Sequence, residues 1–125
     1  MWRAVVESGQ PDLLVAKDNG DVLGWVAFGD CRDQDAKPAQ AEVWAIYVAP
    51  TSWSAGVGRQ LWQRTRDILS ERGYSVCSLW VLPENERAIR FYRSVGFGAD
   101  DVPPQQFELG GSCFQEVRYI CPLVA

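Results

Sequence analysis

The chain has 125 residues, 47% of them hydrophobic, which is enough for one compact domain over residues 1–125 and too few for two. It has no apolar run near the roughly 20 residues of a membrane span and no secretory signal, so we expect a cytoplasmic protein without a membrane partner. The net charge of −4 argues against nucleic acid as a partner.

The cysteines and the lack of histidine limit the chemistry further. Four cysteines contain no Cys-x-x-Cys pair, and the chain has no histidine, so neither a structural zinc site nor a histidine base is expected. Cys77 lies between apolar residues and is predicted to be a small buried side chain.

The N-terminal third of the chain predicts a helix, a hairpin and a loop. Residues Trp2 to Ser8 are interpreted as a short helix, and Leu13 to Ala16 as a strand. The Asn-Gly pair within residues 17–21 predicts a tight turn, from which Val22 to Phe28 returns as the second strand of a hairpin. Residues 29–40 are polar and indicate a loop.

The remainder alternates strands and helices. Glu42 to Val48 is predicted to be a strand that Pro50 ends, and Gly58 to Arg72 is an amphipathic helix. Val76 to Leu82 is an apolar central strand, and Glu86 to Val95 is a second helix. Two further strands follow at Gln105–Leu109 and Cys113–Cys121. This order predicts an α+β fold with a mixed sheet and helices on its faces.

Two glycines, Gly56 and Gly58, stand where the first of these amphipathic helices begins. A helix N-terminus carries unpaired N–H groups and the positive end of the dipole, and glycine lets a ligand approach the main chain, so we expect a phosphate or pyrophosphate there. A dinucleotide fingerprint would need a third glycine where Leu61 stands, and the Gly-Lys-Ser/Thr of a P-loop is absent.

Two stretches together resemble a known family. Residues 41–61 are similar to the acetyl-coenzyme A motif of the GNAT superfamily of N-acetyltransferases, and Asn85–Phe97 is similar to its second motif, Asn-x-x-Ala-x-x-Phe-Tyr-x-x-x-Gly-Phe. The resemblance implies a three-layer α/β/α fold with a mixed, mostly antiparallel central sheet. It also implies transfer of acetyl from acetyl-CoA to a primary amine by direct attack in a ternary complex.

The resemblance also implies a set of cofactor-binding residues. The strand before the glycines would splay from its neighbour at a bulge and leave backbone groups for the pantetheine chain, one of which would polarise the thioester. The residues assigned to acetyl-CoA are Tyr47, Val48, Ala55, Gly56, Val57, Gly58, Arg59, Asn85 and Ala88. The family usually has Arg or Gln where this chain has Trp53, so one potential phosphate donor is missing.

Two residues are candidates for catalysis by the same resemblance. Glu42 would accept the proton of the acceptor ammonium, and simple strand alternation would place it on one face with Trp44, Ile46 and Val48. Tyr92 would protonate the departing thiolate. The alternative interpretations are a strand-end glutamate in water and a core tyrosine.

The family's first strand and first helix are expected to be missing here, which favours a homodimer through an uncovered sheet edge. The acidic loop around Asp30–Asp35 suggests a cationic small-molecule acceptor, with a peptide or protein amine as the other option. A non-catalytic acyl-CoA-binding module and a nucleotide-phosphate binder stay open as alternatives to the enzyme.

Overall fold

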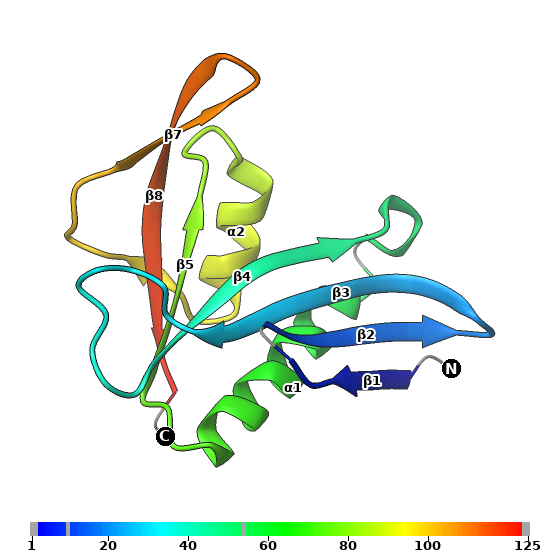
Figure 1. The fold of residues 1–125 in the computed structure, drawn as a ribbon. Coiled ribbons are helices and arrows are strands. Elements are labelled where there is room, and N and C mark those ends of the chain that lie inside the picture. Colours follow the sequence, from blue (N-terminus) through cyan, green and yellow to red (C-terminus); the bar gives the residue numbers. More distant parts are fainter. Residues whose placement is uncertain (1–2, 10, 54, 124–125) are drawn as a thin grey trace.

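The computed structural model describes residues 3–9, 11–53 and 55–123. Over these residues the chain forms an eight-stranded sheet and two α-helices (Figure 1). The elements are β1 (Arg3–Glu7), β2 (Asp12–Asp18), β3 (Asp21–Asp30), β4 (Gln40–Val48), the 3₁₀ turn η1 (Pro50–Ser52), α1 (Val57–Glu71), β5 (Val76–Val81), α2 (Glu86–Ser94), β6 (Gly98–Ala99), β7 (Gln105–Leu109) and β8 (Ser112–Pro122). Neither helix is long and apolar enough to cross a membrane.

The sheet is mixed and mostly antiparallel, as predicted. Its strand order is β1-β2-β3-β4-β5-β8-β6, with β7 paired to β8 outside this path. The pair of β4 and β5 is parallel, and the other pairs between described strands are antiparallel. The predicted Asn-Gly hairpin is confirmed, because Asn19 and Gly20 have φ values of 50° and 85° and Asp18 pairs with Asp21.

The helix predicted for residues 2–8 is wrong. Residues Arg3–Glu7 form β1, which pairs antiparallel with β2 from Arg3↔Lys17 to Glu7↔Leu13, while Trp2 lies outside the described residues. A strand therefore does precede the hairpin, contrary to the expectation of none. The run is short and carries β-branched Val5 and Val6, so pairing with a neighbouring strand outweighs its weak helical pattern.

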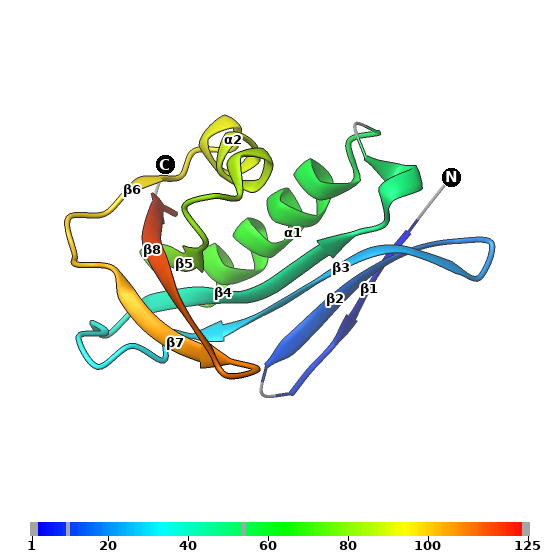
Figure 2. The same ribbon diagram turned by 90° about the horizontal axis from the view of Figure 1, so that it is seen from above.

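Both helices lie on the same face of the sheet (Figure 2). The apolar side of α1 is buried as predicted, with Leu61, Trp62, Thr65 and Leu69 packed over the sheet. The rings of Trp62 and Phe97 are 4.8 Å apart, and α2 packs beside them through partly buried residues. Within the described part of the chain the other face carries no helix, so the second helical layer expected of a three-layer fold is not found there.

A β-bulge in β4 lies next to the point where this strand separates from β5. Ala27 pairs with Ala45 and Phe28 with Val43, so Trp44 is an extra residue in β4. On its other side β4 pairs with β5 over three residues only, ending at Glu42↔Ser78, and the two strands then diverge (Figure 1). The backbone of β4 after Glu42 therefore faces an opening in the sheet.

Candidate acetyl-CoA and catalytic site

The opening between β4 and β5 leads into a cleft of about 660 Å³. This volume is typical of small-molecule sites. Its lining comes from the end of β4, the β4–α1 segment and the facing side of α2: Ile46, Tyr47, Val48, Pro50, Ser52, Trp53, Gly56, Val57, Gly58, Arg59, Asn85, Arg87, Ala88, Phe91 and Tyr92. Two arginines and no carboxylate are among these residues, so the cleft is suited to an anionic ligand.

The N-terminus of α1 forms one end of the cleft. Gly56 precedes the helix with a φ of 83°, a conformation that costs little only for glycine, and none of the described side chains caps the helix. The first N–H groups of α1, from Val57, Gly58 and Arg59, consequently have no intrahelical partner. Space is also limited at Gly58, because a Cβ there would lie 3.3 Å from the ring of Phe91.

Eight of the nine residues assigned to the cofactor line this cleft. The exception is Ala55, which stands beside it and donates its backbone N–H to the carbonyl of Ser52 at 3.3 Å. Asn85 caps α2 as predicted, with its side-chain oxygen accepting from the N–H of Ala88 at 3.2 Å. Its side-chain NH₂ group remains available to a ligand.

Tyr92 lies at the inner end of the cleft between Phe91 and Phe97. Its ring makes edge contacts with both, at centroid distances of 5.6 and 5.8 Å. Burial raises the pKa of Tyr92 to about 12. The phenol is therefore a protonated hydrogen-bond donor throughout the neutral range.

Glu42 is on the opposite face of the sheet from Ile46 and Val48, so the predicted shared face is wrong for these two residues, although Trp44 does lie on the side of Glu42. The bulge at Trp44 shifts the alternation: Val43, Ile46 and Val48 all pack toward the helices, while Glu42 points the other way. The carboxylate is 2% exposed and accepts the backbone N–H of Arg32 at 2.9 Å and its guanidinium at 3.0 and 3.2 Å. The same guanidinium lies 4.2 Å from the ring of Trp44.

Glu116 is a second glutamate on this face, and it was not among the residues predicted from the sequence to act in catalysis. Alternation along β8 places it on the side of Arg118, away from the helices. It is half-buried and forms no hydrogen bond or ion pair with any described residue. Burial, together with repulsion from Glu42, raises the pKa of Glu116. Only its spacing from Arg118 could have indicated this position, because nothing in the sequence shows how β8 lies relative to β4.

The sequence of this chain is similar to those of known proteins. The sequence matches the acetyltransferase (GNAT) family over residues 2–97. The chain belongs to the GNAT family. It is 33% identical over 93 residues to an L-methionine sulfoximine/L-methionine sulfone acetyltransferase of Salmonella typhimurium, covering 74% of this chain and 54% of that protein. It is 32% identical over 98 residues to the L-amino acid N-acyltransferase MnaT of Escherichia coli, covering 78% and 56%.

A solved structure agrees with the GNAT assignment. The yncA acetyltransferase from Salmonella typhimurium, determined with its cofactor acetyl-CoA, superposes with a TM-score of 0.76 at 29% identity, covering 92% of this chain and 66% of that one. The predicted family and the α+β class with a mixed sheet are thereby confirmed. The chain spans about half the length of the curated relatives it matches.

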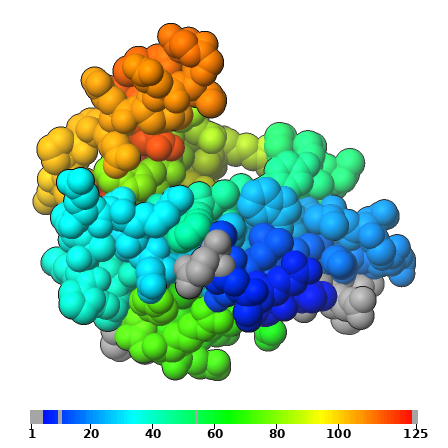
Figure 3. Space-filling view, viewed as in Figure 1, coloured from blue at the N-terminus to red at the C-terminus, as the bar shows by residue number. Residues whose placement is uncertain are grey.

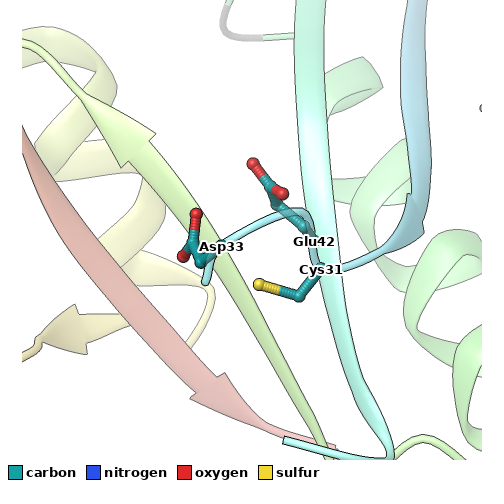
Figure 4. A group of neighbouring side chains, drawn as sticks. All are labelled: Cys31, Asp33 and Glu42. Carbon is teal, nitrogen blue, oxygen red and sulfur yellow. The ribbon is translucent and has the colours of Figure 1, made fainter. Parts of the chain in front are cut away.

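The carboxylates of the acidic loop between β3 and β4 are paired. The expectation of a cationic acceptor had assumed that they are free. Asp33 and Asp35 both pair with buried Arg118, at 3.0 and 2.8 Å, and Asp30 accepts the phenol of Tyr74. Figure 4 shows Cys31 and Asp33 beside Glu42, with ligand atoms within 4.8 Å of one another. Both carboxylates of this group already pair with arginines, Glu42 with Arg32 and Asp33 with Arg118, so the cluster is explained as an ion-pair network.

Proposed function

We propose that this chain is an N-acetyltransferase domain that transfers an acetyl group from acetyl-CoA to a primary amine by direct attack in a ternary complex. The observation that carries the proposal is the cleft at the β4–β5 opening. The unpaired N-terminus of α1 stands at one end of it, and its lining contains no carboxylate. A pyrophosphate fits such a lining, and the GNAT relatives support acetyl-CoA as its carrier.

The residues of the cleft would divide the work of binding. The N–H groups of Val57, Gly58 and Arg59, exposed beyond Gly56, would hold the pyrophosphate, and Asn85 would assist with its amide. The edge of β4 at Tyr47 and Val48 would pair with the pantetheine chain, and one of its N–H groups would polarise the thioester carbonyl. Acetyl-CoA would supply the activated acetyl group, and Ala88 leaves room for its chain because it carries only a methyl group.

Tyr92 would stabilise the sulfur as it leaves. It lines the inner part of the cleft, and its elevated pKa keeps the phenol protonated. A neutral donor aimed at developing negative charge contributes more in a buried, low-dielectric site than it does in water.

The proton of the acceptor ammonium needs a base, and the glutamates Glu42 and Glu116 lie on the face opposite the helices. Glu42 is the base that the family resemblance implies, and it can act only if the ammonium displaces Arg32 from its carboxylate. Glu116 has no such partner among the described residues, and burial raises its pKa above the ordinary value, which makes its carboxylate a stronger base than a solvent-exposed glutamate. Glu42→Gln and Glu116→Gln, assayed side by side, separate the two roles. The base variant loses kcat on the acidic limb of the pH profile, and the other retains it.

The acceptor proposed here is the α-amine of a free amino acid or a close analogue. The named activities of the two relatives support this class, and the pairing of Asp33 and Asp35 with Arg118 removes the argument for a polycation. A peptide amine is the other candidate. Competition between a panel of amino acids and a peptide N-terminus in a thiol-release assay would decide between them.

A non-catalytic acyl-CoA-binding module is the second candidate, favoured by the closed Arg32–Glu42 pair. Isothermal titration with acetyl-CoA, with ATP and NAD as controls, tests the cleft first. Saturable binding of acetyl-CoA followed by amine-dependent thiol release supports the enzyme. Binding without turnover of any amine supports the module, and no binding to a folded sample refutes both.

The homodimer also stays a proposal. β1 lies at the edge of the sheet order and pairs with β2 alone among the described strands, and Val6 on it is 40% exposed. An unpaired edge of this kind can accept a second copy. Light scattering after size exclusion checks this: a monomer mass at micromolar concentration refutes it.

A further inference from the structure

Trp53 and Arg87 meet at the outer part of the cleft. Trp53 lies in the segment before α1 and Arg87 in the first turn of α2, so the two side chains approach from different walls. The guanidinium carbon of Arg87 is 3.2 Å from the centroid of the Trp53 ring. This is a close cation–π contact, in which the planar guanidinium stacks on the indole.

The indole is fixed in place by a second interaction. Its Nε1–H donates to the carbonyl oxygen of Val48, the last residue of β4, at 2.9 Å. The ring therefore cannot turn without losing a hydrogen bond. A fixed ring restricts the rotamers of Arg87, a long and exposed side chain that would otherwise lose conformational entropy on binding a ligand.

Arg87 differs from the arginines on the other face in its charge balance. Arg32 and Arg118 are neutralised by carboxylates at 3.0 Å or less. Arg87 forms no ion pair with any described residue, and neither does Arg59, whose guanidinium donates to Ser94 at 3.4 Å. The cation–π contact uses the face of the guanidinium, and none of its N–H groups donates a hydrogen bond to a described residue. A phosphate accepts such donors in pairs.

We propose that Arg87, held in position by Trp53, binds a phosphate group of acetyl-CoA. This proposal rests on the proposed function of the same cleft. Trp53 stands where the family usually has Arg or Gln, so it cannot itself donate to a phosphate as those side chains could. It compensates by holding the guanidinium of Arg87, from α2, in the cleft. Arg87 is then a binding residue, and Trp53 is a positioning residue.

The test is the dissociation constant of the full chain for two ligands, acetyl-CoA and S-acetylpantetheine, which lacks the phosphates. Arg87→Ala should weaken acetyl-CoA binding about tenfold or more, the usual effect of losing a charge-assisted hydrogen bond. It should leave S-acetylpantetheine binding unchanged. Arg90→Ala is the matched control, because it removes the same charge from the exposed surface of α2 outside the cleft.

The role of Trp53 is tested by the double variant. Trp53→Ala should weaken acetyl-CoA binding severalfold, and adding it to Arg87→Ala should cause little further loss, because the two residues act as one unit. Trp53→Phe keeps a ring for stacking and should lie between Trp53→Ala and the parent. Both side chains are exposed, and melting temperatures check that each variant is folded.

Three results overturn the proposal: parent-like binding of acetyl-CoA by Arg87→Ala, equal losses in Arg87→Ala and Arg90→Ala, or fully additive losses in the double variant. Failure of the unmodified chain to bind acetyl-CoA is a different result. It refutes the proposed function of the cleft, and with it any role of Arg87 toward this ligand.

Discussion

Replacing Tyr92 by Phe removes one hydroxyl group and leaves the ring that packs between Phe91 and Phe97. Burial raises the pKa of Tyr92 to about 12, whereas a simple thiol has a pKa of about 8.5. Full proton transfer from this phenol to a thiolate is therefore uphill by about 3.5 pH units, or about 5 kcal/mol. We infer that the phenol donates a hydrogen bond to the leaving sulfur and that the thiolate takes its proton later from water.

The expected loss of kcat follows from the strength of this one hydrogen bond. A hydrogen bond to a charged group contributes about 1.5–3 kcal/mol, so Tyr92→Phe should lower kcat about 10- to 100-fold. The KM for acetyl-CoA should change little, because the bond strengthens mainly in the transition state. Steady-state thiol release measures both constants, with Tyr74→Phe as a matched control at the other end of α1.

The pH profile provides the refutation. Because the pKa of Tyr92 lies near 12, its titration should produce no alkaline decline in kcat below about pH 10. A decline with an apparent pKa of about 8 to 9 in the parent that vanishes in Tyr92→Phe would show a readily ionised phenol that transfers its proton completely. An unchanged kcat in Tyr92→Phe would remove the residue from the mechanism altogether.

Three further predictions concern the framework around the site. Gly24→Ala should destabilise the fold by about 1–3 kcal/mol in urea unfolding, because its Cβ would lie 2.6 Å from the carbonyl oxygen of Tyr47; an unchanged midpoint contradicts this. Arg118→Met should cost about 3–5 kcal/mol, because it strands the carboxylates that the buried guanidinium neutralises; a variant as stable as the parent would show that they reach water. Burial acts to raise the pKa of Asp12, but hydrogen bonds from the Gly9 amide and Arg72 lower it overall. Its stabilising effect is therefore present above pH 4 and lost as pH falls through the lower folded-state pKa, so Asp12→Asn should flatten the acid side of the profile of unfolding free energy against pH; a profile parallel to that of the parent would refute this.

Local signals were enough to predict the hairpin at Asn19–Gly20, the apolar side of α1 and the cap at Asn85. Each depends on residues that are close in sequence, such as a turn pair, a 3.6-residue period or an N-cap. The residues assigned to acetyl-CoA came largely from the family resemblance, and eight of these nine residues line the cleft.

Features that depend on distant pairing could not be predicted from the sequence. The strand at Arg3–Glu7 exists because β2 offers it a partner. Glu42 lies on the unexpected face because strand alternation has no sequence marker for the extra residue at Trp44. Asp33 and Asp35 of the acidic loop are paired because Arg118, which is 83 residues beyond Asp35 in the chain, lies beside them in the fold. Glu116 and the Arg87–Trp53 contact depend in the same way on the final arrangement of strands and helices.

The bulge at Trp44 also determines which face of the sheet the side chains on either side of it point to. Before the bulge, β4 directs the buried Glu42 carboxylate to the face of the sheet opposite the helices. Figure 3 shows, in space-filling form, the molecule from the side that Figure 1 views. After it, β4 directs Ile46 and Val48 to the helical face, beside the cleft. The inserted residue therefore places Glu42 on the opposite face of this nine-residue strand from Ile46 and Val48. Under the proposed function, the acceptor and the acyl donor would approach the strand from opposite sides without competing for space. A deletion or insertion of one residue in this strand should move side chains from one face of the sheet to the other. Loop grafting around the site should therefore keep the length of β4 unchanged, which matters more than the identity of its side chains.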